Sequence, residues 1–474
     1  MSVLGCPIRH RFRQISRIAC IWAAAEVCRR LKDGPFGVRD NHRVTEPQQA
    51  PESRRVPLQA PAAPARTDVL VVGAGPAGSA AAAWAARAGL DVVLADRSVF
   101  PRDKACGDGL TPRAVAELRR LGLGEWLLGR AANWGLRAAG FGQELYLPWP
   151  GGSLPAYGSA VPRTELDATV REAAVTEGAV PVEQARAVDV ERDGDRVTGV
   201  VFRRGSRTFT IGCNRLVVAD GARSQLGRVL GREWHRDTAY GVAIRGYAKS
   251  SRSDDPWISS HLELRGEDDE LLSGYGWVFP LADGEVNIGV GTLATARRPA
   301  DVALRPLLDV YTEQRREEWG LVGDVRAPAS ALLPMGGAVS GVAGRNWGLV
   351  GDAAGCVNPL NGEGIDYGLE TGRLIAELLG AGGDLSPAWP ATLRGHYGEA
   401  FSVARRLASL ITVPGLLPAA GPVGMRSRTL MKLALRVMGN LVSDEDRDAV
   451  ARVWRAAGRL SSRWDARPPF ASAR

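Results

Sequence analysis

Short apolar runs and an alanine-rich stretch alternate over residues 68–96, and this pattern predicts a strand, a helix and a second strand. Asp68–Val72 is a β-branched and apolar run, as expected for a buried parallel strand. Ser79–Ala88 is rich in alanine and precedes Gly89, which predicts a helix that ends there. A second apolar run, Asp91–Ala95, completes a βαβ unit.

Three glycines occupy the turn between the first predicted strand and the helix. Gly73 allows a tight turn, Gly75 lets the backbone approach a pyrophosphate, and Gly78 lets the helix pack close to the strand. The helix N-terminus then offers free N–H groups to phosphate. Asp96 follows the second strand, 18 residues beyond Gly78, where it would accept hydrogen bonds from a ribose. The whole unit therefore predicts a dinucleotide site.

The formal net charge of +8 is unevenly distributed along the chain. Residues 1–66 hold 12 Lys and Arg against 5 Asp and Glu, whereas the rest holds 48 against 47. The body of the protein is nearly neutral, so electrostatic binding of nucleic acid is not expected. Residues 1–66 are expected to form a disordered basic extension, with a weak membrane-surface anchor as the alternative.

Cysteine and apolar residues set further limits on the class of protein. Six scattered cysteines without a CxxC pair fit neither a disulfide framework nor a zinc site, so we expect a reducing compartment and no metal. No window of 18 apolar residues predicts a membrane-spanning helix. Residues 423–442 interleave apolar and basic side chains, which favours an amphipathic helix. Such a helix lies at a bilayer surface or packs on the protein with its basic residues in water.

Two later segments have the features of a nucleotide site. An apolar run leads into Gly351 and Asp352, and a turn rich in glycine then precedes a helix-like stretch, Asp366–Leu379. Between the two ends of the chain, Asp220 and Gly221 follow another apolar run. Together with the first turn, these segments resemble the three motifs of the p-hydroxybenzoate hydroxylase-like flavoproteins. The resemblance implies that the dinucleotide is FAD.

The same resemblance implies roles for individual residues. Asp352 would bind the ribityl or pyrophosphate region, and the helix after it would point its N-terminus at the flavin ring. Arg163 matches an arginine at the head of a helix near the flavin. The middle segment is similar to the family's DGxxSxxR motif, except that Arg228 stands one position late, which leaves the role of this arginine open.

A more specific resemblance comes from two other segments. Phe100–Gly109 is similar to the KxCGxG-like loop of the geranylgeranyl reductase branch, where it lies against the isoalloxazine. Tyr275–Pro280 matches the YxWxFP motif of that branch, whose aromatic residues line a prenyl cavity. From about Asp68 to Phe470 the chain resembles the bacterial menaquinone reductases, which saturate one double bond in the isoprenoid tail of menaquinone.

The resemblance implies an α/β fold with a Rossmann-like FAD-binding domain of the p-hydroxybenzoate hydroxylase type. We expect that domain to be discontinuous, formed by residues 67–235 and 325–380. An antiparallel β substrate domain would occupy residues 236–324, and a helical C-terminal region residues 381–474. Within the substrate sheet, Leu281–Gly291 predicts a hairpin.

Reduction of a tail alkene needs a hydride at one carbon and a proton at the other, because no carbonyl polarises the double bond. FAD would supply the hydride, while the protein holds the alkene and excludes water. Cys106 is the candidate proton donor, with Tyr275 or a bound water as alternatives, and Trp277 is expected to line the site. No second GxGxxG is present, so the electron donor stays open among NADPH, a quinol and a ferredoxin.

Other functions on the same fold are weighed against this one. They are a reductase of another prenyl lipid, an FAD-dependent aromatic monooxygenase, a flavin halogenase, whose WxWxIP motif is not met, and a flavin-binding scaffold without turnover. We expect a cytoplasmic protein peripheral to the cell membrane, where its prenylated substrate resides. The residues expected to bind FAD are Gly73, Gly75, Pro76, Ala77, Gly78, Asp96, Arg97, Lys104, Cys106, Gly107, Asp108, Gly109, Arg163, Asp220, Gly221, Gly351, Asp352, Pro359, Gly362, Gly364 and Ile365.

Overall fold

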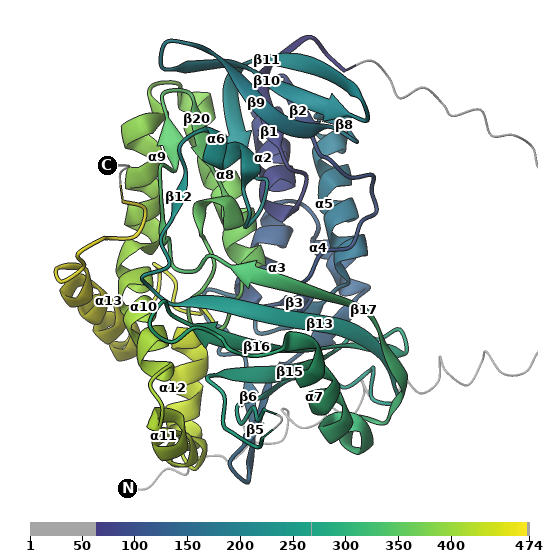
Figure 1. The fold of residues 1–474 in the computed structure, drawn as a ribbon, viewed down its shortest axis with the longest axis vertical. Helices are drawn as coiled ribbons and strands as arrows, with labels where there is room; N and C mark the ends of the chain where they lie inside the picture. Colours follow the sequence, from purple (N-terminus) through teal and green to yellow (C-terminus); the bar gives the residue numbers. More distant parts are fainter. Residues whose placement is uncertain (1–62, 267, 472–474) are drawn as a thin grey trace, which may run out of the picture. The chain divides into compact units, whose positions relative to one another are not determined.

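One largely parallel and one largely antiparallel sheet form the framework of the protein (Figure 1). The computed structural model describes residues 63–266 and 268–471. Residues 1–62, most of the predicted basic extension, lie outside the described residues. The first strand begins at Arg66, next to the predicted end of that extension. The finer division of the chain into FAD-binding, substrate and C-terminal domains stays a prediction.

The first sheet has eight strands and a parallel centre, as the βαβ pattern predicts. β1 (Arg66–Val72) lies between β11 (Arg207–Val218) and β2 (Val92–Ala95). β20 (Trp347–Leu349) and β8 (Val180–Val182) extend the parallel order on either side. The antiparallel strands are β19 (Ala343–Gly344), β9 (Arg186–Asp193) and β10 (Arg196–Arg204). The carboxyl ends of the parallel strands meet at one edge, which gathers the turns that follow them.

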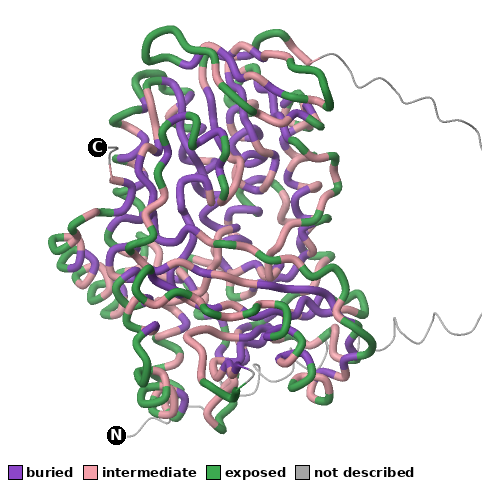
Figure 2. Tube along the Cα trace, viewed as in Figure 1, coloured by how far each residue is buried: buried purple, intermediate pink, exposed green. Residues whose placement is uncertain are grey.

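Helices pack against this sheet and bury most of its central strands (Figure 2). α2 (Pro76–Arg87) begins before the predicted Ser79, because proline suits the first helical turn, where no N–H is required. α2 packs closely on α8 (Ile365–Ala381), since a side chain at Gly372 would come within 2.5 Å of the carbonyl oxygen of Ala77. The other helical segments here are α3 (Pro112–Arg120), α4 (Gly124–Leu128), α5 (Arg163–Thr176), α6 (Gln225–Val229) and the 3₁₀ turn η1 (Gly351–Ala354).

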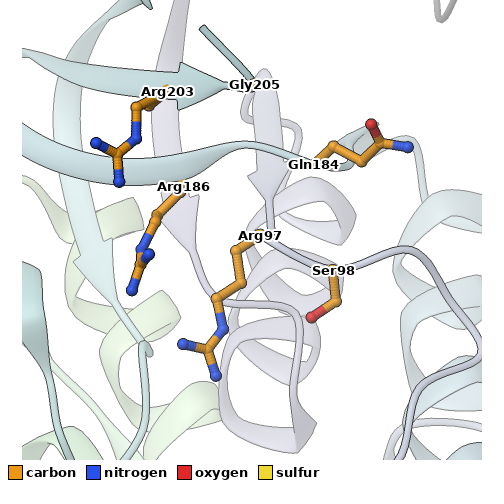
Figure 3. Close-up of a pocket in the computed structure, with 6 residues that line it drawn as sticks. All are labelled: Arg97, Ser98, Gln184, Arg186, Arg203 and Gly205. Atoms are coloured by element: carbon orange, nitrogen blue, oxygen red, sulfur yellow. The ribbon is translucent and has the colours of Figure 1, made fainter.

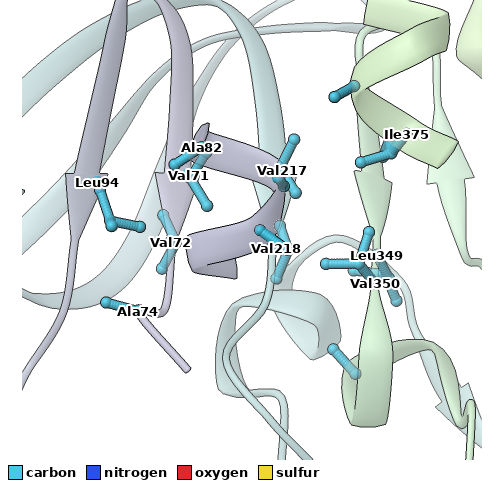
Figure 4. Close-up of a cluster of buried hydrophobic side chains, with 14 of the residues drawn as sticks. Val71, Val72, Ala74, Ala82, Leu94, Val217, Val218, Leu349, Val350 and Ile375 are labelled. Atoms are coloured by element: carbon cyan, nitrogen blue, oxygen red, sulfur yellow. The ribbon is translucent and has the colours of Figure 1, made fainter. Parts of the chain in front are cut away.

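The core between the sheet and its helices is largely aliphatic (Figure 4). Val71, Leu94, Val217 and Leu349 come from four neighbouring strands, and each is at most 1% exposed. Ile375 of α8 belongs to the same buried cluster. Burial of one such side chain contributes about 1.5–3 kcal/mol, so the cluster fixes the strand ends from which the functional turns depart.

The second sheet has seven strands, and all its neighbours run antiparallel except one pair. Their order is β17 (Leu321–Leu333), β13 (Tyr240–Ser250), β16 (Glu285–Ala294), β15 (Gly274–Pro280), β14 (Ile258–His261), β5 (Gly135–Gly140) and β6 (Gln143–Pro148). β15 and β16 form a hairpin around the predicted turn, with Trp277 opposite Gly289. α7 (Leu304–Trp319) buries Tyr311 and Trp319 in a core shared with this sheet.

Two strands join the second sheet from a segment that was expected elsewhere. β5 and β6 come from residues 135–148, which the sequence analysis placed in the FAD-binding part. β5 pairs in parallel with β14, so Ala138 lies opposite Ser260. The substrate sheet is therefore not confined to residues 236–324. Two small sheets complete the strands: β3 (Gly109–Leu110), β7 (Gly158–Ala160) and β4 (Ala131–Asn133), and β12 (Glu233–Trp234) with β18 (Val339–Ser340).

The C-terminal region is helical, as predicted. Its helices are α9 (Leu385–Leu393), the π-helical turn η2 (Arg394–Gly398), α10 (Glu399–Ile411), α11 (Leu416–Met425), α12 (Arg428–Met438) and α13 (Ala449–Ser462). Residues 423–442 do not form one helix, because the chain breaks between α11 and α12. Among the described helices none is alone long and apolar enough to cross a membrane; residues 385–411 and 416–425 pass together by length and composition, but are bent by 111°.

Candidate functional site

The first glycine turn follows β1 and begins α2, as the sequence predicts. Gly73 has a φ of +106°, and a side chain there would overlap the carbonyl group of Ala219. A side chain at Gly78 would overlap the carbonyl oxygen of Gly73, so helix and strand approach as closely as the motif requires. Gly75 caps α2, and a Cβ there would lie 3.3 Å from the guanidinium of Arg102. Pro76 and Ala77 form the first helical turn beside this cation, which suits a pyrophosphate.

Asp96 stands directly after β2 and is 8% exposed. One oxygen accepts a hydrogen bond of 2.7 Å from the amide of Ala74, and the other accepts one of 2.7 Å from Ser98. The backbone of both neighbouring turns thus holds the carboxylate in one orientation. Its predicted contact with a ribose stays a prediction, for which each oxygen retains a free lone pair.

Arg97, the next residue, lines a shallow pocket of about 460 Å³ (Figure 3). Arg186 and Arg203 bring two more guanidinium groups to the same pocket. Three cations without a carboxylate among the lining residues favour an anionic group there. The structure therefore places Arg97 at the edge of the predicted ribose site.

The middle motif forms a closed turn after β11. Asp220 accepts a hydrogen bond of 2.6 Å from the hydroxyl of Ser224 and one of 2.8 Å from the amide of Leu226, and Gly221 follows it in the turn. Burial raises the pKa of Asp220, and these two hydrogen bonds oppose the shift. Arg228 stands one position late for this motif, and the sequence analysis missed a second arginine close by. Arg232 donates 2.6 Å to the carbonyl oxygen of Ala353 and so ties this turn to the next one.

The second glycine-rich corner gathers around Asp352. The ammonium group of Lys104 lies 2.9 Å from one oxygen of this carboxylate, and a Cβ at Gly364 would lie 3.1 Å from the other. Although burial acts to raise the pKa of Asp352, Lys104 and then Arg163 lower it, so the group is ionised. Gly364 is also the N-cap of α8, whose first residue is Ile365. The remaining predicted residues of this corner, Gly351, Pro359 and Gly362, lie in η1 and in the turn before α8.

Arg163 is the first residue of α5 and is held by Asp167 one turn later. Its guanidinium donates two hydrogen bonds, of 2.7 and 2.8 Å, to the two oxygens of this carboxylate. Arg102 adds an ion pair of 2.9 Å to the same group. Burial raises the pKa of the Cys106 thiol, and the nearby Arg163 opposes this shift. The cysteine is therefore a neutral thiol beside a fixed cation.

The loop around Cys106 packs directly on β15, so the two most specific motifs meet. A Cβ at Gly107 would lie 3.1 Å from the ring of Phe279 and 3.3 Å from Nε1 of Trp277. A Cβ at Gly109 would lie 2.9 Å from Phe279. These two positions hold glycine because the aromatic side chains of β15 fill the space beside them.

A buried network around Asn287 joins the loop to the aromatic strand. Nε1 of Trp277 donates 2.9 Å to the side-chain oxygen of Asn287, whose amide nitrogen donates 2.9 Å to the carbonyl oxygen of Cys106. The same nitrogen donates 2.9 Å to Asp108, which also accepts 2.8 Å from the hydroxyl of Tyr247. Burial raises the pKa of Asp108 to about 6, and its two hydrogen-bond donors limit the shift. The network fixes the indole of Trp277 against the loop.

Tyr275 lies on the same strand, and its ring centre is 5.9 Å from that of Trp277. Its hydroxyl donates to the carbonyl oxygen of Asn361, in the turn before α8. Burial raises the pKa of Tyr275, and the nearby Glu363 and Cys106 raise it further. The structure thus brings together all three residues predicted to be catalytic. Residues that line this region but were missed from the sequence are Arg102, Asp167, Arg232, Tyr247, Asn287 and Glu363.

A polar residue inside an alternating apolar strand was the signal for one of these six. Asn287 stands between Val286 and Ile288, which are both fully buried, and a buried amide needs partners. Arg102 and Glu363 stand inside motifs, and Asp167 lies one helical turn after Arg163, but no role was assigned to them. Arg232 and Tyr247 carry no local signal, because their partners are distant in sequence. In the described part of the chain, no group of three or more His, Cys, Asp or Glu is placed to hold a metal ion.

The comparisons with known proteins identify the family of the chain. Residues 66–258 match the FAD binding domain family. A menaquinone reductase of Mycolicibacterium smegmatis is 66% identical over 408 residues, which cover 85% of this chain and 99% of that protein. A menaquinone reductase of Mycobacterium tuberculosis is 63% identical over 404 residues, covering 85% of this chain and 98% of that protein.

More distant relatives share the fold. A digeranylgeranylglycerophospholipid reductase of Methanopyrus kandleri is 31% identical over 66% of this chain and 80% of its own length. The crystal structure of a geranylgeranyl bacteriochlorophyll reductase-like protein of Thermoplasma acidophilum superposes with a TM-score of 0.64 at 19% identity, covering 83% of this chain and 95% of that one.

Fold, site and comparisons together define an FAD-dependent oxidoreductase of the geranylgeranyl reductase type. Its glycine turns, the cations Arg102 and Lys104 and the N-termini of α2 and α8 all suit this cofactor. The chain belongs to the menaquinone reductase family.

Proposed function

We propose that this protein saturates one double bond in the isoprenoid tail of menaquinone. The observation that carries the proposal is the Asn287 network, which fixes an aromatic strand against the loop of Cys106. An aromatic wall of this kind can hold an apolar alkene and exclude water from it. The names of the two mycobacterial relatives support menaquinone as the substrate.

The chain's own residues would bind, orient and protect the reactants. When bound, reduced FAD supplies the hydride. Lys104 and Asp352 would hold the ribityl or pyrophosphate region, and Arg102 would face the phosphates beside Gly75. Trp277 and Phe279 would form the apolar wall beside the loop, where their positions are fixed by packing on Gly107 and Gly109. The second reactive carbon needs a proton, for which Cys106, Tyr275 and a bound water are the candidates from the sequence.

One anaerobic assay tests the proposed reaction. The purified flavoprotein is supplied with menaquinone and a chemical reductant, and the tail is analysed by mass spectrometry. We expect a gain of two daltons in the tail. A geranylgeranyl lipid is offered in parallel. If only this lipid gains two daltons, the protein is a reductase of another prenyl substrate. Oxygen-dependent hydroxylation of an aromatic compound, with no gain in the tail, would favour the monooxygenase.

We also propose that the protein docks on the cytoplasmic face of the cell membrane through α10, α11 and α12. Leu410, Val423, Leu430 and Leu433 are 40–64% exposed on these helices. Three exposed cations, Arg426, Arg428 and Lys432, are interleaved with them. Apolar side chains between basic residues suit an anionic bilayer surface. Arg436 is a further basic residue of this stretch, but it pairs with Asp446 and Asp448.

Vesicle flotation tests this docking surface. We expect the protein to float with vesicles that contain anionic lipid and to stay behind with purely zwitterionic vesicles. The double substitution Leu430→Ser and Leu433→Ser should abolish flotation. Val322→Ser removes a side chain on β17 that is more exposed than either leucine, and it serves as the control. If the double variant floats as well as the Val322→Ser control, the proposal is wrong.

A further inference from the structure

We propose that the carboxyl group of Glu363 is the proton donor for the second carbon of the alkene. This inference rests on the proposed reduction of an isoprenoid tail. Glu363 lies between Gly362 and Gly364, in the turn that leads into α8 and that the sequence assigns to the flavin. It also lies beside Tyr275. Tyr275 belongs to β15, the strand that forms the predicted wall of the substrate site.

The turn holds Glu363 in one position. Its amide donates 2.9 Å to the side-chain oxygen of Asn361, and its carbonyl oxygen accepts 2.8 Å from the amide of Asn358. The side chain is held separately, because Oε1 accepts 2.6 Å from the hydroxyl of Thr111. Thr111 follows β3, which continues the loop that carries Cys106. The carboxyl group therefore joins the two segments that flank the expected flavin.

The second carboxyl oxygen, Oε2, is buried and has no hydrogen-bond partner in the part of the chain that the structure describes. Burial of a charged carboxylate oxygen without a hydrogen-bond partner costs free energy, and burial of a protonated, neutral carboxyl group costs less. Since the hydroxyl of Thr111 donates to Oε1, the proton belongs on Oε2. No described group accepts a hydrogen bond from that proton.

The charges around Glu363 favour this protonated form. Burial raises the pKa of Glu363 well above its usual value, and the neighbouring Asp366 raises it further, while the hydrogen bonds from Thr111 and then Arg113 lower it. Asp366 has its own pKa raised to about 6 by burial, against the hydrogen bond from Asn440 and the charge of Arg113. At neutral pH the deprotonated Asp366 therefore keeps its neighbour in the acid form.

The two other candidates are weaker donors. The hydroxyl proton of Tyr275 is already directed at the carbonyl oxygen of Asn361, and burial raises the pKa of this phenol. Burial also raises the pKa of the Cys106 thiol above that of an ordinary cysteine. A carboxylic acid is the strongest of the three, and Thr111 and Arg113 remain to stabilise the carboxylate that donation leaves.

The step balances in atoms and electrons. The O–H bond at Oε2 breaks, and its proton forms a C–H bond at one alkene carbon. The hydride that reduced FAD supplies forms a C–H bond at the other carbon, so the π bond is lost and the tail is reduced by two electrons. FAD is left oxidised, and the carboxylate of Glu363 recovers its proton from water.

Substitution of Glu363 in the FAD-loaded protein tests the inference. Glu363→Gln keeps the shape and the acceptor for Thr111 but removes the acid, so single-turnover reduction of the tail should slow by about 10²–10⁴-fold. FAD content and flavin reduction should be unchanged. Glu363→Asp should recover part of the rate, and Glu172→Gln, an exposed change on α5, should match the natural protein.

Infrared spectroscopy gives a readout that does not depend on turnover. At about pH 8, above the pKa of Asp366 and Asp108, the natural protein should show the carbonyl stretch of a protonated carboxylic acid. This signal should vanish in Glu363→Gln and stay in Glu172→Gln. If the natural protein reduces menaquinone and Glu363→Gln reduces it at the same rate, Glu363 is not the proton donor, while the proposed function stands. The same conclusion follows if Glu363→Gln keeps the infrared signal. If the natural protein gives no gain of two daltons in the menaquinone tail, both the proposed function and the donor role of Glu363 are wrong.

Discussion

The two ends of the cofactor site are built in different ways. At the turn between β1 and α2, the protein uses backbone, and Gly73 and Gly78 are required because any side chain would overlap a carbonyl group. At the Cys106 loop, the protein uses side chains that come from far along the chain, with Asn287 as their common partner. The first region is therefore specified locally by its sequence, and the second by tertiary packing. The two regions should fail differently when they are changed.

The largest effect is expected from Gly78→Ala in the first region. The added methyl group would overlap the carbonyl oxygen of Gly73, so we expect a loss of about 3 kcal/mol or more of unfolding free energy and no bound FAD. Denaturant unfolding and the flavin absorbance of the purified protein measure both. Gly380→Ala, at an exposed position of α8 with no described atom within 4 Å of the added carbon, should cost nothing or stabilise by about 1 kcal/mol. Normal FAD content in Gly78→Ala would show that the backbone here is not closely constrained.

A smaller effect is expected from Asn287→Leu in the second region. It removes the partner of Trp277 and one donor to Asp108, which should cost roughly 2–4 kcal/mol of unfolding free energy. FAD should still bind, because the glycine turn is untouched, while tail reduction falls. The ratio of flavin to protein and the anaerobic rate separate these two outcomes. Asn214→Leu, at an exposed site, should change stability by less than about 1 kcal/mol. Loss of FAD from Asn287→Leu would mean that the two regions are not independent.

The pH dependence of stability should come next in size. The pKa of Asp108 is raised to about 6 in the folded protein, whereas an unfolded aspartate has a pKa near 3.8. Between these values the folded state binds a proton that the unfolded state has released, so stability decreases as the pH rises from about 4 through 6. One pKa unit corresponds to roughly 1.4 kcal/mol, so the whole change is a few kcal/mol at most. Unfolding free energies of the natural protein and Asp108→Asn across this range should converge at low pH. Parallel curves would contradict the assignment.

The smallest effect is expected from Cys106→Ser. If Glu363 donates the proton, the thiol has no essential chemical role, and the rate of tail reduction should stay within about tenfold of the natural protein. FAD content should be unaffected, since the backbone of the loop and Gly107 are kept. Anaerobic turnover followed by mass spectrometry provides the measurement. A loss of about 10²–10⁴-fold with normal flavin reduction would return the donor role to Cys106.

The first region shows what the sequence alone could predict. Apolar runs, glycine positions and Asp96 are local signals, and the structure has the strand, turn, helix and second strand where they indicate them. The start of α8 and the hairpin of β15 and β16 follow from equally local patterns. These predictions succeed because each element is specified by residues within a few positions of it.

The second region shows where sequence reasoning stops. Thr111 and Glu363 are 252 positions apart, and Asn287 lies 181 positions from Cys106, so no periodicity connects either pair. The parallel pairing of β5 with β14 also joins segments about 120 positions apart, which is why residues 135–148 were not expected in this sheet. Only the packing of the two sheets brings these groups together.

The close contact between α2 and α8 has a consequence for both regions. α2 begins at the expected pyrophosphate and α8 at the expected flavin ring, and Gly372 meets the carbonyl oxygen of Ala77 without room for a side chain. This one crossing point sets the spacing between the two helix starts. A bulkier residue at position 372 would therefore change the distance between the two helix starts that an extended cofactor has to bridge. It would do so without contacting either end of the cofactor. The helix–helix distance would thus set the length of the molecule that both helix starts can bind.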